Sequence, residues 1–450
     1  MSDLASKIRE KSLVIHCPTV SIWQDIEVGI KLDGYGTIKI NRHGVIYLEF
    51  IYLSSDNLPY NLHTQIPKDA LDPKQTVFLE AIALDGSKYI SKDLSIKFNL
   101  NSLHPPGVMN IILKYIEIVD NIDVSKNSHL YFEFLEKCNI PANKSNSIIS
   151  SLGYEEYSWN QAIIMHENIE ISVVDNKEYT TISISGNFNP DILLGCIKFY
   201  IGFGDGSYVQ PYLIYRINNG IKKTVINSIN QEKILQRSSN PLPSSTIYSG
   251  SKTDYHYNIL INIIKLRYKN PDWYNCINAH WDRVWHSFQT KNNIMSLTLS
   301  VAIEGILNDI YIPKLENNNN KELNDEIEEL KKEIAKLNIT TKYKDKLYSS
   351  ISHFKKITAA KAMDHLVNRG IITISDKKAW IKVRNMSAHP RKKDHSIASE
   401  TDERNNIFLC LNLFHSLIFN VLSYSGPRNY FSIDQGNKVI EIKYINIFNE

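Results

Sequence analysis

Cysteine is scarce in this sequence and follows none of the patterns that bind metals or build disulfide frameworks. The 450 residues contain five cysteines, an odd number, with no C-x-x-C pair and no Cys/His cluster at zinc spacing. Neither a disulfide framework nor a structural metal is therefore indicated, and a reduced compartment is expected. The five positions are Cys17, Cys138, Cys196, Cys276 and Cys410.

Long apolar runs are also absent. No run approaches the ~20 residues that a membrane span needs, and the N-terminus has no apolar signal core. We therefore expect a cytoplasmic protein that does not associate with a membrane. The length predicts roughly two or three domains, each able to bury its own core.

An excess of one charge is absent from the whole chain but present in one segment. The formal net charge is +3 at pH 7, which excludes a protein that coats nucleic acid over its entire surface. Residues 351–400, however, contain eleven Lys or Arg against four Asp or Glu, a local excess of +7, with four histidines. Such a basic field attracts a polyanion, although a solvated basic surface without a ligand is the other interpretation.

Alternation of apolar and polar residues predicts β structure in the first half. Residues 36–41 and 45–50 flank an Asn-Arg-His-Gly turn, which is typical of a hairpin. An antiparallel sandwich or barrel over residues 1–240 follows, either as one body or as two lobes that meet near residues 140–150. Further strands are predicted at 77–84, 88–90, 169–174, 180–185, 197–203 and 208–217.

Helical periodicity begins after a linker rich in Ser, Pro and Asn at residues 237–246. Residues 255–425 predict a helical bundle, in which residues 376–388 form a helix with Ser375 as its N-cap. The tail, residues 426–450, alternates like one or two strands. The predicted class is therefore α+β.

One helix of this bundle carries a narrow apolar seam. Leu323, Ile327, Leu330, Ile334 and Leu337 recur at steps of four and three on an otherwise charged segment. This spacing is typical of a coiled coil, so the seam packs either within the chain or against a second subunit.

The segment from Trp380 to Pro390, Trp-Ile-Lys-Val-Arg-Asn-Met-Ser-Ala-His-Pro, places an arginine, an amide and an imidazole close together. Asn385 and His389 are four residues apart and share a helix face, and Arg384 lies one residue off it. Because proline disfavours helical geometry at the preceding residue, His389 is expected at a fraying helix end. A permanent cation beside a group that titrates near neutrality suits attack at a phosphodiester without a metal.

This Arg-Asn-x-x-x-His arrangement resembles the RNase signature of the HEPN superfamily, and it is most similar to that of the ApeA-like HEPN proteins of bacterial anti-phage defence. An apolar helix at 297–311, with Glu304 near its centre, precedes the motif, and residues 363–370 (Met-Asp-His-Leu-Val-Asn-Arg-Gly) lead into it. The resemblance covers about residues 255–425. The N-terminal half is only loosely similar, mainly through residues 77–86.

The resemblance implies a metal-independent endoribonuclease that needs no cofactor. A ribose 2′-hydroxyl would attack the adjacent phosphate and leave a 2′,3′-cyclic phosphate and a 5′-hydroxyl. HEPN domains commonly pair so that two motifs line one cleft, which implies a homodimer. By the same analogy, the N-terminal region is a sensing or targeting module, and a phage-derived activator releases a toxic activity that causes abortive infection.

Four residues are assigned to catalysis on this basis. His389 would remove the 2′-hydroxyl proton, while Arg384 and Asn385 would stabilise charge on the phosphorane. Each also has a structural interpretation: a capping histidine, a salt bridge between Arg384 and Glu304, and a helix-end amide. Glu304 interrupts an apolar helix, where an unpaired charge is costly, so it is either part of the site or a counter-ion.

Six basic residues around the motif are predicted to follow an RNA backbone. Single-stranded or loop RNA is the favoured substrate, because in-line attack needs a backbone that can leave A-form geometry. The six are Lys377, Lys378, Lys382, Arg391, Lys392 and Lys393.

Two alternative functions remain open. Some HEPN domains are inactive, so the chain could be a noncatalytic binding or scaffold protein. Asp434 with Glu441 and Lys443 imitates the D…E-x-K pattern of metal-dependent nucleases, but only seven residues follow Lys443, too few to complete the usual α/β core. The glycine-rich stretch 202–206 resembles a phosphate loop, yet it is predicted as a turn between strands.

Overall fold

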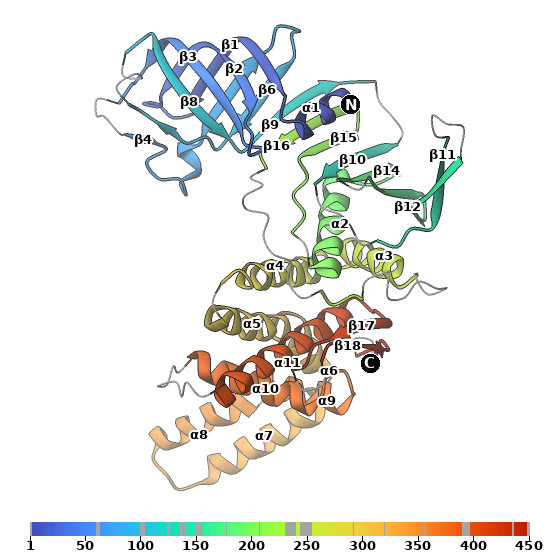
Figure 1. Cartoon of the computed structure of the whole chain (residues 1–450). Coiled ribbons are helices and arrows are strands. Elements are labelled where there is room, and N and C mark those ends of the chain that lie inside the picture. The colour runs from blue at the N-terminus through green and yellow to red at the C-terminus, as the bar shows by residue number, and fades with distance from the viewer. Residues whose placement is uncertain are drawn as a thin grey trace. The chain divides into compact units, whose positions relative to one another are not determined.

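The computed structural model divides the chain into two compact units. The sheet unit comprises Met1–Leu194 and Val209–Leu235, and the helical unit comprises Gly195–Tyr208 and Gln236–Glu450. Antiparallel sheet in the N-terminal half followed by helices confirms the predicted α+β class (Figure 1). The structure describes residues 2–59, 64–99, 104–123, 127–135, 138, 140–149, 155–176, 178–206, 208–229, 240–243, 254–290, 292–318, 320–354, 357–388, 397–433 and 436–447.

Fourteen strands among the described residues of the sheet unit form one antiparallel sheet. Its order is β11-β12-β13-β14-β10-β15-β16-β9-β6-β5-β1-β2-β3-β8. The strands are β1 (Val14–Gln24), β2 (Lys31–Ile40), β3 (Ile46–Asp56), β5 (Val77–Ile82), β6 (Lys88–Lys92), β8 (Gly107–Leu113), β9 (Tyr115–Asn121), β10 (Ser128–Phe134), β11 (Lys144–Ile149), β12 (Glu155–His166), β13 (Ile169–Asp175), β14 (Thr180–Gly186), β15 (Leu213–Asn218) and β16 (Ile221–Asn227). A separate two-stranded sheet pairs β4 (Gln65–Ile66) with β7 (Ile96–Lys97), and Pro73–Gln75 form a short 3₁₀ helix, η1.

The sheet follows the alternation in the sequence. In β3 every second side chain, from Ile46 to Tyr52, is fully buried, and the core-facing residues of β8 alternate with exposed ones. This is the burial pattern of a sheet with one face on a core and the other in solvent. The predicted hairpin is confirmed as β2 and β3, which pair from Ile40↔Ile46 outward.

The hairpin β15–β16 joins the two halves of the sheet. On one side β15 pairs with β10, and on the other β16 pairs with β9. These two strands come from a late segment of the chain, so the continuous sheet depends on residues 213–227.

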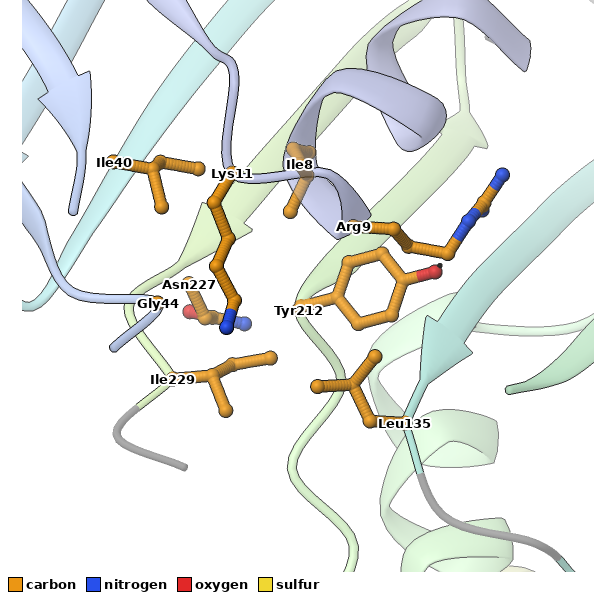
Figure 2. A pocket seen from close by; sticks show the side chains of 9 residues that line it. All are labelled: Ile8, Arg9, Lys11, Ile40, Gly44, Leu135, Tyr212, Asn227 and Ile229. Carbon is orange, nitrogen blue, oxygen red and sulfur yellow. Dashed lines mark hydrogen bonds between the residues drawn. The ribbon is translucent and has the colours of Figure 1, made fainter. Parts of the chain in front are cut away.

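A buried ionic cluster fastens the N-terminal helix α1 (Ser2–Arg9) to the sheet. Arg9 Nη1 donates to Glu133 Oε2 at 2.5 Å and to the Tyr212 hydroxyl at 3.2 Å, and the hydroxyls of Tyr131 and Tyr212 also donate to Glu133. Glu133 is 3% exposed, and a buried carboxylate needs compensation of its charge. Arg9, Tyr131 and Tyr212 supply it. Figure 2 shows Arg9 beside the Tyr212 ring.

Of the four later strand predictions, two are confirmed, one is confirmed only in part and one is wrong. Residues 169–174 and 180–185 lie in β13 and β14, and of residues 208–217 only 213–217 form a strand, β15. Residues 197–203 belong to a helix, α2 (Pro190–Asp205). Asn189 Oδ1 accepts hydrogen bonds from the backbone N–H groups of Asp191 and Ile192, which caps the helix directly before Pro190. The glycine-rich stretch at 202–206 is therefore mostly the last turn of α2 and not a turn between strands.

The helical unit is built from successive helices and one C-terminal hairpin. Its core contains fully buried side chains of a central pair of helices, including Ile303 and Ile306 of α5 and Phe414 and Leu417 of α11. The elements are α3 (Asp254–Lys269), α4 (Pro271–Ser287), α5 (Asn292–Ile306), η4 (Leu307–Tyr311, a π-helical turn), α6 (Ile312–Asn318), α7 (Asn320–Lys336), α8 (Thr341–Phe354), α9 (Ala359–Asn368), α10 (Ile374–Ala388), α11 (Ile397–Val421), β17 (Gly426–Tyr430) and β18 (Lys438–Ile442).

The helix that carries the motif begins two residues earlier than predicted. Thr373 Oγ1 accepts from the Asp376 N–H at 3.1 Å, and Asp376 Oδ2 accepts from the Thr373 N–H at 2.8 Å. This reciprocal capping box replaces the predicted Ser375 cap, because Ser375 lies inside α10.

The predicted apolar seam packs within the chain. Ile327 and Ile334 of α7 are 2% and 8% exposed and contact Ile351 and Tyr348 of α8. Leu330, in contrast, is 51% exposed. Only part of the seam therefore forms this small core.

A continuous helical segment, Asn293–Glu316, combines α5, η4 and α6. Its 24 residues are long and apolar enough to cross a membrane, and half of its most apolar window is buried inside the protein. It also carries exposed polar side chains at Asn308 and Asp309.

Candidate functional site

The structure places Arg384 of α10 against Glu304 of α5. Arg384 Nε donates to Glu304 Oε2 at 3.0 Å, and its Nη2 donates to Oε1 at 2.8 Å. Two parallel N–H···O bonds fix both the position and the plane of the guanidinium. The side chains remain 49% and 30% exposed, so the pair lies at the protein surface.

Trp380 supports this pair from one helical turn earlier. Its ring is buried, its indole N–H donates to the Ser300 carbonyl at 3.2 Å, and the Arg384 guanidinium carbon lies 5.4 Å from its ring centroid. A cation over a tryptophan face is favourable, so the ring and the carboxylate together restrict the guanidinium. Trp380 is accordingly a core residue and not an exposed platform for a base.

Asn385 is exposed beside Arg384. The described part of α10 ends at Ala388, and His389 and Pro390 lie outside the described residues. Of the four predicted catalytic residues, the structure therefore brings Arg384 and Glu304 into contact and leaves Asn385 free to face solvent.

Of the three predicted RNA-binding lysines of α10, two lie beside carboxylates of the protein. Lys377 pairs with Asp364, and Lys382 Nζ lies 3.6 Å from Asp402 on α11. Lys378 is exposed. The other three predicted residues, Arg391, Lys392 and Lys393, lie outside the described part of the chain.

A solvent-open hollow adjoins Glu304, lined by residues of α4, α5 and η4. Cys276, His280 and Asp309 meet there, and their ligand-type atoms all lie within 4.8 Å of one another. Burial, together with the positive charge of Arg283, lowers the pKa of His280. Burial and the neighbouring Asp309 carboxylate raise the pKa of Cys276 to about 12.

Sequence reasoning missed this cluster. Cys276 and His280 are four residues apart, so they share one face of α4, and that spacing was the available signal. Asp309 comes from a distant segment, and only the packing of η4 against α4 brings it close.

The residues of the metal-dependent nuclease alternative lie at the C-terminal hairpin. Glu441 belongs to β18 and pairs with Pro427 of β17, and Lys443 follows directly after the strand; both side chains are exposed. Asp434 lies outside the described residues. Among the residues that the structure describes, β17 and β18 form a sheet of two strands, which supplies no further acidic strand for such a site.

The sheet unit has a small pocket of its own beside α1. Ile8, Leu135 and the Tyr212 ring supply apolar walls, and Lys11 extends along one side (Figure 2). Lys11 Nζ donates to the Arg42 carbonyl at 2.7 Å, and Arg9 is held by Glu133. Both cations at this pocket therefore already bind groups of the protein.

Comparison with known proteins adds nothing to this geometry. No family model, curated protein or solved structure matches this chain.

Proposed function

We propose that this chain is a metal-independent endoribonuclease of the HEPN type that acts in the cytoplasm in anti-phage defence. The observation that supports it most directly is the arginine of the motif: Arg384 is oriented by the two hydrogen bonds that it donates to Glu304, yet half of its side chain remains exposed. The helix that carries it runs to Ala388, the residue before His389.

The orientation of Arg384 leaves it able to bind a phosphate. A guanidinium has five N–H donors, and Glu304 accepts two of them. The remaining N–H groups would face a phosphodiester while the carboxylate keeps the plane fixed. Glu304 is then a positioning residue, which combines its two predicted roles.

The proposed reaction is an internal transesterification. His389 takes the proton of the 2′-hydroxyl, the 2′-oxygen forms a bond to phosphorus, and the bond from phosphorus to the 5′-oxygen breaks. Arg384 and Asn385 stabilise the additional negative charge on the phosphorane. A proton returns to the 5′-oxygen, so the products are a 2′,3′-cyclic phosphate and a 5′-hydroxyl.

The proposed dimer, activator and biological role rest on the resemblance to HEPN proteins. Two copies of the chain would pair through the helical unit and bring two motifs to one cleft, so that a second His389 could protonate the leaving oxygen. The sheet unit would respond to a phage-derived activator. RNA cleavage would then arrest growth.

The test compares cleavage of labelled RNA and matched DNA by wild-type, His389→Ala and Glu441→Ala proteins, each with added Mg²⁺ or with EDTA. We expect cleavage of RNA alone, without added Mg²⁺, with 2′,3′-cyclic ends, and lost only in His389→Ala. Purified protein should be assayed with and without lysate from phage-infected cells, because the proposal includes an activator.

Other outcomes assign the chain to another class. Mg²⁺-dependent DNA cleavage that is lost in Glu441→Ala would support the metal-dependent nuclease. A wild-type protein that binds RNA but stays inert both with and without the lysate from phage-infected cells would support a noncatalytic scaffold.

A further inference from the structure

The helical unit contains a second chemical cluster that RNA cleavage does not require. Cys276 and His280 occupy successive turns of α4, and Asp309 faces them from η4. Cys276 Sγ lies 3.7 Å from Asp309 Oδ2. Tetrahedral zinc holds its ligand atoms roughly 3.5 Å apart. The sulfur and the carboxylate are therefore already close to that spacing, and an imidazole nitrogen lies within 4.8 Å of both.

His280 has a buried nitrogen that makes no hydrogen bond within the part of the chain that the structure describes. Its side chain is 8% exposed, and its Nδ1 is buried without a hydrogen-bond partner among the described residues. Buried polar atoms without a partner are uncommon and costly. A metal ion would supply the missing interaction for an imidazole nitrogen.

The backbone around the cluster is shaped to admit this imidazole. A Cβ at Gly305 would lie 2.3 Å from His280 Nε2, so only glycine at this helical position leaves room for the ring. Glycine is less favourable than alanine inside a helix. Immediately after it, the helix widens into the π-turn η4 that presents Asp309, and such turns are frequent at functional sites.

We propose that Cys276, His280 and Asp309 bind a divalent transition-metal ion of the zinc class. A thiolate, an imidazole and a carboxylate select Zn²⁺ or Co²⁺ over Mg²⁺ and Ca²⁺, which prefer oxygen ligands alone. Binding replaces the thiol proton, which leaves to solvent, by a bond from sulfur to the metal. The fourth position faces the open hollow and takes a water molecule.

The charges of the hollow are compatible with this ion. Arg283 lines the same hollow and opposes a cation. The thiolate and the Asp309 carboxylate carry two negative charges, which offset the two positive charges of the metal. Glu304 also lines the hollow, but Arg384 already occupies both of its oxygens.

The experiment titrates Co²⁺ into metal-free full-length protein and follows its absorption spectrum. We expect one equivalent to bind with a sulfur-to-cobalt charge-transfer band and the strong visible bands of tetrahedral Co²⁺, and Zn²⁺ should displace it. Cys276→Ser should abolish the charge-transfer band, and Asp309→Asn should weaken binding at least tenfold.

Matched controls separate this site from incidental binding. Cys17→Ala removes a buried cysteine of the sheet unit, and Asp272→Asn neutralises an exposed acid in the first turn of α4; both should leave the titration unchanged. Circular dichroism of each variant shows whether it is folded. A wild-type protein without the charge-transfer band, or a band that survives in folded Cys276→Ser, would overturn the proposal. RNA cleavage is not a readout, so this result is independent of the proposed nuclease.

Discussion

The orientation of the Arg384 guanidinium depends on the Glu304 carboxylate, which accepts two of its hydrogen bonds. A lysine at this position would keep the positive charge but lose the planar fork that Glu304 grips at two points. Substitution of this arginine by lysine therefore tests whether RNA cleavage needs the planar geometry of the guanidinium or only its charge.

We expect Arg384→Lys to lower RNA cleavage by about 10²-fold or more, the usual effect of losing one fixed donor to a transition-state oxyanion. Its free energy of unfolding should change by no more than about 1 kcal/mol, because the ion pair is exposed. Cleavage rates and urea unfolding are measured on the same preparations. Lys265→Ala, exposed on α3, is the control, and equal losses of activity in the two variants would contradict a specific role for the guanidinium.

Two buried histidines set a pH limit for the helical unit. Burial lowers the pKa of His415 to about 3 and that of His256 to about 4. His415 lies among aromatic rings, 5.7 Å from the Phe203 centroid, and the Tyr200 hydroxyl is 2.9 Å from His256 Nδ1. Both are neutral when folded, whereas the unfolded chain takes up protons near pH 6.5.

Because the folded pKa values lie below the unfolded ones, the stability is complete above about pH 6.5 and is lost as the pH falls toward 4. We expect each histidine to cost about 1.4 kcal/mol per pH unit in this window. Urea unfolding followed by tryptophan fluorescence at pH 7, 6 and 5 measures the slope. His415→Gln should reduce that slope by less than half, because burial also lowers the pKa of His280, and an unchanged slope would show that other groups cause the acid sensitivity.

At the scale of elements, the sequence predicted those features that depend on short-range patterns of residues. The hairpin β2–β3 and strands β13 and β14 followed from alternation, and the ion pair of Arg384 with Glu304 was foreseen because a carboxylate in an apolar helix needs a cation. The error at α2 has a physical cause: residues 197–203 are apolar on nearly all sides, and periodicity cannot distinguish a buried helix from a buried strand. The cap at Asn189 and Pro190 was the better signal.

The metal-type cluster could not be predicted in the same way. Cys276 and His280 share a helix face by spacing alone, but Asp309 reaches them through the packing of η4 on α4 and through the space left by Gly305. A sequence encodes such contacts only through the complete fold.

The seam on α7 gives a prediction at this scale. Ile327→Ala should destabilise the α7–α8 pair by about 2–5 kcal/mol, because it empties a buried position. Leu330→Ala, at an exposed position of the same seam, should stay within about 0.5 kcal/mol. Hydrogen exchange of residues 320–354 measures both. If Leu330→Ala instead dissociates a dimer in sedimentation, the exposed part of the seam is a subunit contact.

At the scale of the molecule, neither unit is one continuous stretch of chain. The chain enters the helical unit within α2, returns to the sheet unit at Val209 and leaves it again after Leu235. Phe199 packs edge-on against Trp281 at 5.8 Å, and the Trp285 indole donates to the Gly206 carbonyl at 2.8 Å. The segment 195–208 is therefore part of the helical core.

We expect a fragment of residues 240–450, which lacks α2, to be poorly soluble and to unfold at much lower temperature than the full chain, since it exposes the partners of Phe199 and Phe203. Residues 189–208 joined by a flexible Gly/Ser linker to residues 240–450 form the matched control and should fold cooperatively. Thermal unfolding of both fragments is the measurement. A cooperative transition of the shorter fragment at the temperature of the control would show that α2 is dispensable.

The late position of β15 and β16 has a consequence for biosynthesis. When the first 194 residues have left the ribosome, β10 and β9 still lack the neighbours that join them, so the nascent chain holds two sheet fragments with open edges. Exposed strand edges invite pairing with other chains. Translation through residue 227 closes that gap, so a pause just before this point would be the moment of greatest risk for aggregation.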